Sequence, residues 1–122
     1  MSDARLVGTW TTWLDDDGKA VPGLVRFTAD GGVVSTQVNT RNIGLGSWRS
    51  TGPDTFEYGF HILAVDGEGT HVGEAHVRVE GEFVSDTGWQ GTGGADFYDP
   101  RGTKLRGHGG SKVTAEKFGV DD

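Results

Sequence analysis

Turn signals recur at short intervals along the whole chain, and they restrict its possible folds more than any other feature of the sequence. Each signal combines glycine with aspartate or asparagine, residues that adopt the backbone conformations of tight turns. They lie at residues 15–22, 29–32, 39–44, 51–54, 66–69, 85–88 and 99–102. Seven turns divide the chain into eight short segments, and none of these segments carries a helical repeat of apolar residues.

The eight segments are rich in valine, threonine and aromatic residues and mostly alternate between apolar and polar positions, as strands do. We predict strands near 6–14, 23–28, 33–38, 45–50, 55–65, 70–84, 89–98 and 103–117. Because every connection is short, consecutive strands should pair antiparallel. The expected fold is all-β, a single eight-stranded antiparallel up-and-down barrel. A two-sheet sandwich is the alternative, although it usually needs longer crossover connections.

Length and composition are those of one compact domain. With 122 residues, 34 % hydrophobic and 24 % charged, we expect a single domain over 1–122, with a loose C-terminal tail at 118–122. There is no cysteine, and the N-terminal residues lack the pattern of a signal peptide. We therefore expect a cytoplasmic protein, present as a monomer or a homodimer.

The charge pattern argues against two classes of partner. The formal net charge is −7, and no basic stripe is present, so we expect no nucleic-acid partner. No apolar run approaches the length of about 18 residues that a spanning helix needs, so we also expect no membrane partner.

The alternation assigns side chains to the barrel interior. The apolar face of segment 55–65 carries Phe56, Tyr58, Phe60, Ile62 and Ala64. A four-residue turn would pair Phe56 with Val79 and place His61 opposite Glu74. Further inward positions are predicted at Val34, Thr36 and Val38 in segment 33–38, and at Leu105, Gly107, Gly109, Ser111, Val113 and Ala115 in segment 103–117.

The stretch "GWQGTGGADF" at residues 88–97 places glycine or alanine at several inward positions. An eight-stranded barrel is just wide enough to fill with side chains or to hold one small ligand. The small residues therefore favour a ligand cavity, although glycines that only permit strand curvature remain the alternative. Bulky aromatic residues gather near the tight turns. We expect them to close that end, with an open mouth at the 15–22 and 39–44 loops.

The motif "GTW" at residues 8–10, on the first strand of an eight-stranded meander, resembles the Gly-x-Trp signature of lipocalin-like (calycin) barrels. The short chain is similar to the small lipocalin-like proteins of actinobacteria. The resemblance implies that Trp10 packs across the closed end beside a basic residue, which Lys112 or Lys117 could supply. It also implies that the lumen binds a small, largely apolar molecule. Barrels of this kind also include cofactor-independent cyclases and isomerases of natural products.

We derive candidate site residues from these inward faces. Tyr58 and His71 are the candidate catalytic groups, because a phenol or an imidazole can polarise a carbonyl. Tyr58 could equally be an ordinary core tyrosine. The expected lumen residues are Trp48, Thr12, Thr36, Phe60, Ile62, Gly91, Gly93, Ala95 and Ser111.

The function that these residues predict is binding of a small apolar molecule, with cyclisation or isomerisation of a polyketide-like substrate as a possible reaction. A non-catalytic carrier or sensor is the alternative. We expect no cofactor. We also expect no metal site, because His61, His76 and His108 lie on outward faces without three or four clearly converging ligands.

Overall fold

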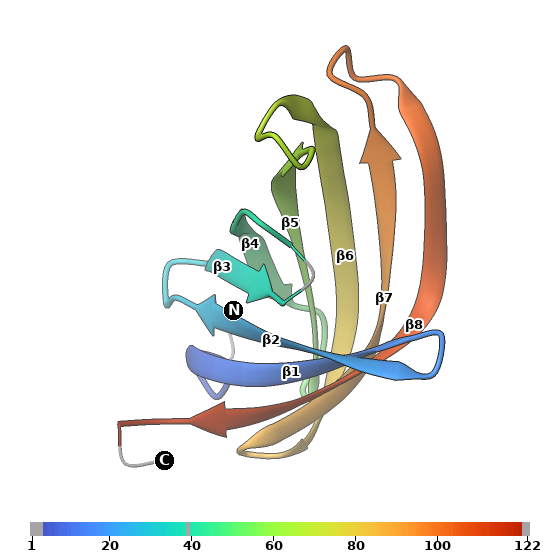
Figure 1. Cartoon of the computed structure of the whole chain (residues 1–122). Helices are drawn as coiled ribbons and strands as arrows, with labels where there is room; N and C mark the ends of the chain where they lie inside the picture. The colour runs from blue at the N-terminus through green and yellow to red at the C-terminus, as the bar shows by residue number, and fades with distance from the viewer. Residues whose placement is uncertain (1–3, 39, 121–122) are drawn as a thin grey trace.

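The computed structural model describes residues 4–38 and 40–120 and forms a closed antiparallel β-barrel (Figure 1). Its strands are β1 (Gly8–Asp16), β2 (Lys19–Phe27), β3 (Gly32–Gln37), β4 (Gly44–Ser50), β5 (Thr55–Val65), β6 (His71–Ser85), β7 (Gly88–Tyr98) and β8 (Lys104–Phe118). Each strand pairs with the next, and β8 pairs with β1 to close the barrel. The predicted all-β, up-and-down architecture is confirmed. None of the described residues forms a helix with the length and hydropathy needed to cross a membrane.

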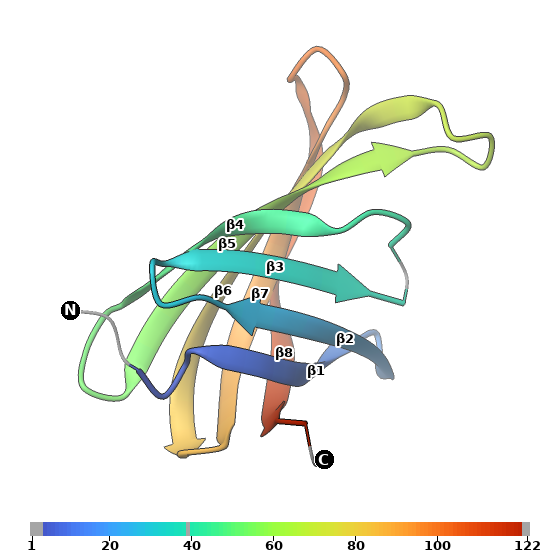
Figure 2. The same ribbon diagram turned by 90° about the vertical axis from the view of Figure 1, so that its left-hand side faces the viewer.

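The barrel is uneven in height. Strands β6 and β8 are 15 residues long, whereas β3 and β4 have six and seven. The β5–β6 and β7–β8 hairpins consequently extend beyond the shorter strands, and they diverge from each other at their tips (Figures 1 and 2). All residues from 101 to 110 are exposed. The protruding hairpins therefore contribute little to the buried core.

Aromatic side chains fill the opposite end, near the 29–32, 51–54 and 85–88 turns. Phe56 contacts Phe27, Phe83 and Trp89 with ring centroids 5.2–6.3 Å apart. The most deeply buried members of this aromatic cluster are Trp10, Trp89, Phe27 and Phe56. The predicted plug of aromatic residues at the tight-turn end is present, and it forms the main core of the barrel.

Trp10 is held at the closed end from two sides. A turn precedes β1, and in it Leu6 is fully buried and its carbonyl accepts a 2.9 Å hydrogen bond from the Trp10 indole. The Lys117 ammonium lies 5.6 Å from the Trp10 ring centroid and donates to the Arg5 carbonyl. Lys117, rather than Lys112, is the basic neighbour that the lipocalin-like resemblance implies.

The first hairpin is tighter than predicted. β1 continues to Asp16, and β2 begins at Lys19. Only Asp17 and Gly18 therefore form the turn, and both have positive φ. Two successive residues with positive φ are typical of the two-residue hairpin turn that matches strand twist. The expected long loop at 15–22 is therefore wrong. At the C-terminus, β8 includes Phe118, one residue of the predicted tail, while 121–122 lie outside the described residues.

The structure differs from the predicted register in β6, β3 and β8, and the first of these differences changes only the neighbours of each residue. Phe56 pairs with Gly81 rather than Val79. Val65 pairs with His71, so the turn is one residue longer than predicted, and the irregularity between Ala64 and Val65 adds the second residue of the shift. A shift of two keeps each side chain on its predicted face but changes its neighbours. His61 consequently lies opposite His76, not Glu74.

Two strands differ by a single residue, which exchanges their faces. In β3, Val33 and Ser35 are buried while Val34 and Thr36 are exposed, so the predicted inward positions of Thr36 and Val38 are wrong. The consecutive valines of "GVVST" leave the alternation ambiguous.

In β8, a bulge near Gly110 shifts the pairing with β7 between Gly93 and Ala95. Above this bulge, Leu105, Gly107 and Gly109 are exposed, contrary to prediction. Because one extra residue inverts the alternation, His108 now pairs with Ala95 and shares its side of the sheet. His108 is therefore not wholly outward as predicted: it is exposed, lines the mouth of the interior cavity and also borders a hollow on the outer surface.

Candidate functional site

A hollow of about 270 Å³ occupies the barrel interior above the aromatic cluster. It is lined by residues of β1, β3 and β5–β8, together with Thr40 of the 38–43 connection. Asp16, Gln37, Thr40, Phe97 and His108 line it toward the end where the long hairpins protrude. The cavity therefore opens at the end where the mouth was predicted. Segment 15–22 contributes Asp16, the last residue of β1, and not a loop residue as expected.

The walls of the cavity are mainly apolar. Phe60, Ile62 and Val79 are buried, and Val77 and Ala75 pack against the same core. These residues come from β5 and β6, where strict alternation places every second side chain inward. Beside them on the adjacent strand β7, Gly93 and Ala95 pair with Val79 and Val77 and contribute little side-chain volume. The small residues on this part of the wall leave space inside the barrel.

Tyr58 marks the boundary between the packed end and the cavity. Its ring packs against Phe27 at 5.0 Å and against Trp89 at 5.9 Å, and the residue also lines the cavity. Burial raises the pKa of the Tyr58 phenol well above its ordinary value, since an anion without a counter-charge is disfavoured there. The phenol therefore stays protonated at physiological pH and can donate a hydrogen bond.

Three buried hydroxyl groups line the cavity without a protein partner. Tyr58, Thr12 and Ser35 are 5–6 % exposed. Within the described part of the chain, no hydrogen bond joins their three hydroxyls to another residue. These hydroxyls are open to the cavity, whereas the fully enclosed polar atom without a partner among the described residues is the indole nitrogen of Trp89. A hydroxyl that opens onto a cavity can bond to water or to another molecule there, which avoids the cost of about 1–3 kcal/mol for an enclosed unsatisfied group. Three such groups around one hollow are therefore available as hydrogen-bonding groups to its contents.

The structure brings together most of the predicted lumen residues. Those that line the cavity are Tyr58, Thr12, Phe60, Ile62, Gly93, Ala95 and Ser111. Their functional roles stay predictions, because position alone does not test them.

Four predicted residues lie elsewhere. His71 is exposed on β6, where its ring bonds to the Gly73 carbonyl oxygen. Trp48 is buried against Phe27 and donates its indole N–H to the Thr28 carbonyl, so it fills space beside the cavity. Thr36 faces outward, and a side chain at Gly91 would overlap the Glu80 carbonyl. Gly91 therefore allows β7 to approach β6 closely, which is a structural role and not a role in lining the cavity.

The sequence reasoning missed polar residues of the cavity, namely Ser35, Gln37 and His108. Ser35 and Gln37 face inward once Val33, rather than Val34, is assigned to the inner face of β3. The two consecutive valines concealed this choice. His108 sits in the motif "GHGG" at 107–110, and paired glycines inside a strand are a recognised bulge signal. Treating that motif as a bulge would have placed His108 in the lumen.

No family model and no curated protein matches this chain. The closed barrel of eight antiparallel strands, the Gly-x-Trp motif on β1 and the cationic neighbour of Trp10 are consistent with a lipocalin-like fold.

Proposed function

We propose that the barrel binds one small, largely apolar molecule that carries oxygen atoms. The observation that supports this most strongly is the set of unpartnered hydroxyls of Tyr58, Thr12 and Ser35 around one cavity. Apolar walls with a few placed polar groups are the usual composition of a small-molecule site. A ligand carbonyl or hydroxyl would satisfy these groups while its carbon skeleton contacts Phe60 and Ile62.

The cavity volume limits the size of this ligand. About 270 Å³ is slightly below the range of about 300–1,000 Å³ that is typical of ligand pockets. One or two fused rings, or a short branched chain, fit this limit better than an extended lipid. The polar residues Gln37 and His108 toward the mouth suit a second oxygen atom at the other end of the ligand.

A test of binding is native mass spectrometry and fluorescence titration with β-naphthol, a two-ring molecule with one hydroxyl. We expect a one-to-one adduct. Gly93→Leu, which adds a side chain beside Val79 and Val113 in the cavity, should abolish it. Thr92→Leu is the matched control, because Thr92 is the adjacent, exposed residue of β7. Equal binding by both variants would place the ligand outside the lumen, and absence of an adduct with β-naphthol and related phenols would contradict the proposal.

A second candidate function is cofactor-independent isomerisation or cyclisation of a carbonyl compound, such as a polyketide-like chain. The observation that favours it is the protonated, buried Tyr58 phenol, whose pKa is raised by burial. Such a phenol can stabilise the negative charge that develops on a carbonyl oxygen when an adjacent C–H loses its proton. His108 lines the same cavity and would accept that proton and return it elsewhere on the substrate, with the Asp16 carboxylate at the mouth as the other candidate base.

Catalysis and simple transport differ in the fate of the bound molecule. Incubation with a β,γ-unsaturated cyclohexenone, followed by ultraviolet absorbance, would detect its conjugated isomer. An isomerase should lose about tenfold or more in rate in Tyr58→Phe. Unchanged turnover in this variant would remove Tyr58 from the mechanism. A bound ketone that is recovered unaltered would favour a carrier.

A further inference from the structure

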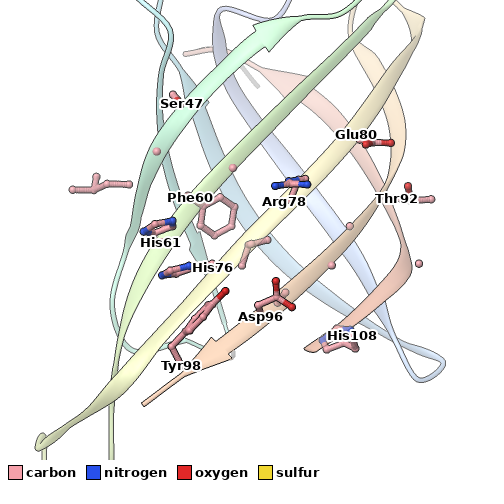
Figure 3. A pocket seen from close by; sticks show the side chains of 18 residues that line it. Ser47, Phe60, His61, His76, Arg78, Glu80, Thr92, Asp96, Tyr98 and His108 are labelled. Atoms are coloured by element: carbon pink, nitrogen blue, oxygen red, sulfur yellow. The ribbon is translucent and has the colours of Figure 1, made fainter. Parts of the chain in front are cut away.

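Two histidines and a glutamate meet on the outer face of the barrel, away from the lumen. His61 of β5 and His76 of β6 are directly paired across the two strands, with parallel rings 3.6 Å apart. Figure 3 shows both imidazoles side by side at the edge of an outer groove. Glu74 lies two residues before His76 and therefore on the same face of β6. The predicted register would have placed Glu74 opposite His61. The observed register differs by two residues and places His76 there, which brings the second imidazole into this cluster.

The separations between the three side chains resemble those of metal ligands. Glu74 Oε1 lies 3.2 Å from His76 Nε2 and 3.7 Å from His61 Nδ1, and all three ligand atoms lie within 4.8 Å of one another. Ligands about 2.0–2.1 Å from a tetrahedral zinc ion are about 3.3 Å apart. The distances from Glu74 to each histidine are thus close to the spacing of ligands around one ion. The His61 side chain is 61 % exposed, so it has room to turn inward and bring its Nδ1 closer to His76 Nε2.

We propose that His61, Glu74 and His76 bind a divalent transition-metal ion of the zinc class, through Nδ1, Oε1 and Nε2 respectively. Two imidazoles and one carboxylate suit Zn²⁺, Co²⁺, Ni²⁺ or Cu²⁺, whereas Mg²⁺ and Ca²⁺ prefer oxygen ligands alone. The ligands stand on paired strands, so the backbone holds them without the entropy cost of ordering a loop. Binding tilts the two parallel rings so that their nitrogen lone pairs point at one ion.

The surroundings leave this ion an open coordination position. The ligand set supplies three donors, and tetrahedral zinc takes a fourth, which water or a small anion can provide. The Tyr98 ring packs against His76 at 4.3 Å and supports the position of that imidazole. Both histidines border an outer hollow of about 780 Å³ that also contains Arg78, two residues further along the same face of β6 (Figure 3). The groove also contains the carboxylates of Glu80 and Asp96, so its charge is mixed and water is the simplest fourth ligand.

Calorimetric titration of the untagged protein with zinc chloride tests this site. We expect one equivalent of Zn²⁺ to bind, and no comparable binding of Mg²⁺. His76→Ala, His61→Ala and Glu74→Gln should each weaken binding by about tenfold or more. His71→Ala is the matched control, since His71 is another exposed histidine of β6 and should leave the affinity unchanged. Near-ultraviolet circular dichroism confirms that each variant keeps its fold.

Nitrogen NMR signals of the imidazole rings provide a second readout that does not depend on any variant. Zn²⁺ should shift the Nδ1 resonance of His61 and the Nε2 resonance of His76, and leave His71 unaffected. Failure to bind Zn²⁺, binding that persists in His76→Ala, or binding that is lost equally in His71→Ala would overturn the proposal. The lumen residues are not involved, so this result is independent of ligand binding inside the barrel.

Discussion

Gly81 at the closed end of the barrel and Gly109 at the open end serve opposite purposes. At the closed end, Gly81 lies under the Phe56 ring, and a side chain there would overlap that ring. At the open end, a Cβ added at Gly109 would meet no heavy atom within 4 Å. Gly81 makes room for an aromatic side chain, whereas Gly109 leaves space unfilled. Other glycines near the open end are tightly enclosed, since a side chain at Gly73 would overlap the Tyr98 carbonyl. The difference between the two ends therefore lies in how densely side chains pack, and not in glycine content.

This contrast separates stability from binding. The closed end concentrates the buried aromatic residues, which contribute most of the hydrophobic free energy. The open end has exposed hairpins, a bulge and the cavity mouth. Regions with few buried contacts open at lower free energy than the core. The half that contains the cavity can therefore move while the other half maintains the fold.

The largest expected effect comes from truncating one aromatic side chain at each end. Phe56→Ala should lower the free energy of unfolding by about 3–5 kcal/mol, because Phe56 is 1 % exposed and contacts rings on all sides. Phe97→Ala should cost about 1 kcal/mol, since Phe97 is only half-buried and packs mainly against Arg106 and His108. Urea denaturation followed by tryptophan fluorescence measures both. Equal losses would mean that the protruding hairpins carry as much of the core as the closed end.

Two glycines of neighbouring strands give the next largest difference. Gly91→Ala should destabilise the barrel by about 1–3 kcal/mol, because the new methyl group would overlap the backbone of β6. Gly109→Ala should be neutral or stabilise by about 0.4–1 kcal/mol, because its site is open and its φ is not positive. Thermal unfolding of both variants tests this. A loss of stability at Gly109 would show that the open end depends on glycine flexibility.

The same contrast explains which parts of the structure could be predicted from the sequence. The closed end follows from local signals, because turn residues separate strands whose aromatic positions alternate regularly. Phe56, Tyr58 and Phe60 fall on one face in any register that keeps this alternation. The barrel, its plugged end and the inward position of Tyr58 were therefore predictable.

The open end depends on events that alternation does not record. One inserted residue near Gly110 inverts the upper half of β8, and this bulge places His108 in the cavity. Two adjacent valines conceal the phase of β3, and so Thr36 was predicted inward in place of Ser35. The pairing of His61 with His76 depends on an irregularity beside Val65. Bulges and turn geometry are set by tertiary contacts, so the polar residues of the site were the least predictable part.

Alkaline pH tests the boundary between the two ends at Tyr58. In the unfolded chain the phenol ionises near pH 10, whereas burial raises its pKa in the folded barrel. Above pH 10 the unfolded state therefore binds fewer protons, and the stability of the wild-type protein should fall by up to about 1.4 kcal/mol per pH unit from this group. Tyr58→Phe should show a shallower decline. Equal slopes in urea denaturation between pH 9 and 11 would show that the phenol reaches solvent through the cavity.

The smallest effect on stability concerns the hydroxyls of Thr12 and Ser35, which separates a site built for binding from one built for packing. Because neither hydroxyl has a hydrogen-bond partner among the described residues, Thr12→Val and Ser35→Ala should change the free energy of unfolding by less than about 1 kcal/mol, in the stabilising direction for Thr12→Val. Both variants should nevertheless weaken β-naphthol binding, since they remove groups that the ligand hydroxyl would meet. A residue that only packs would show the reverse, with stability lost and affinity kept. The double variant is the decisive sample, because full stability with lost affinity assigns the hydroxyls to the ligand.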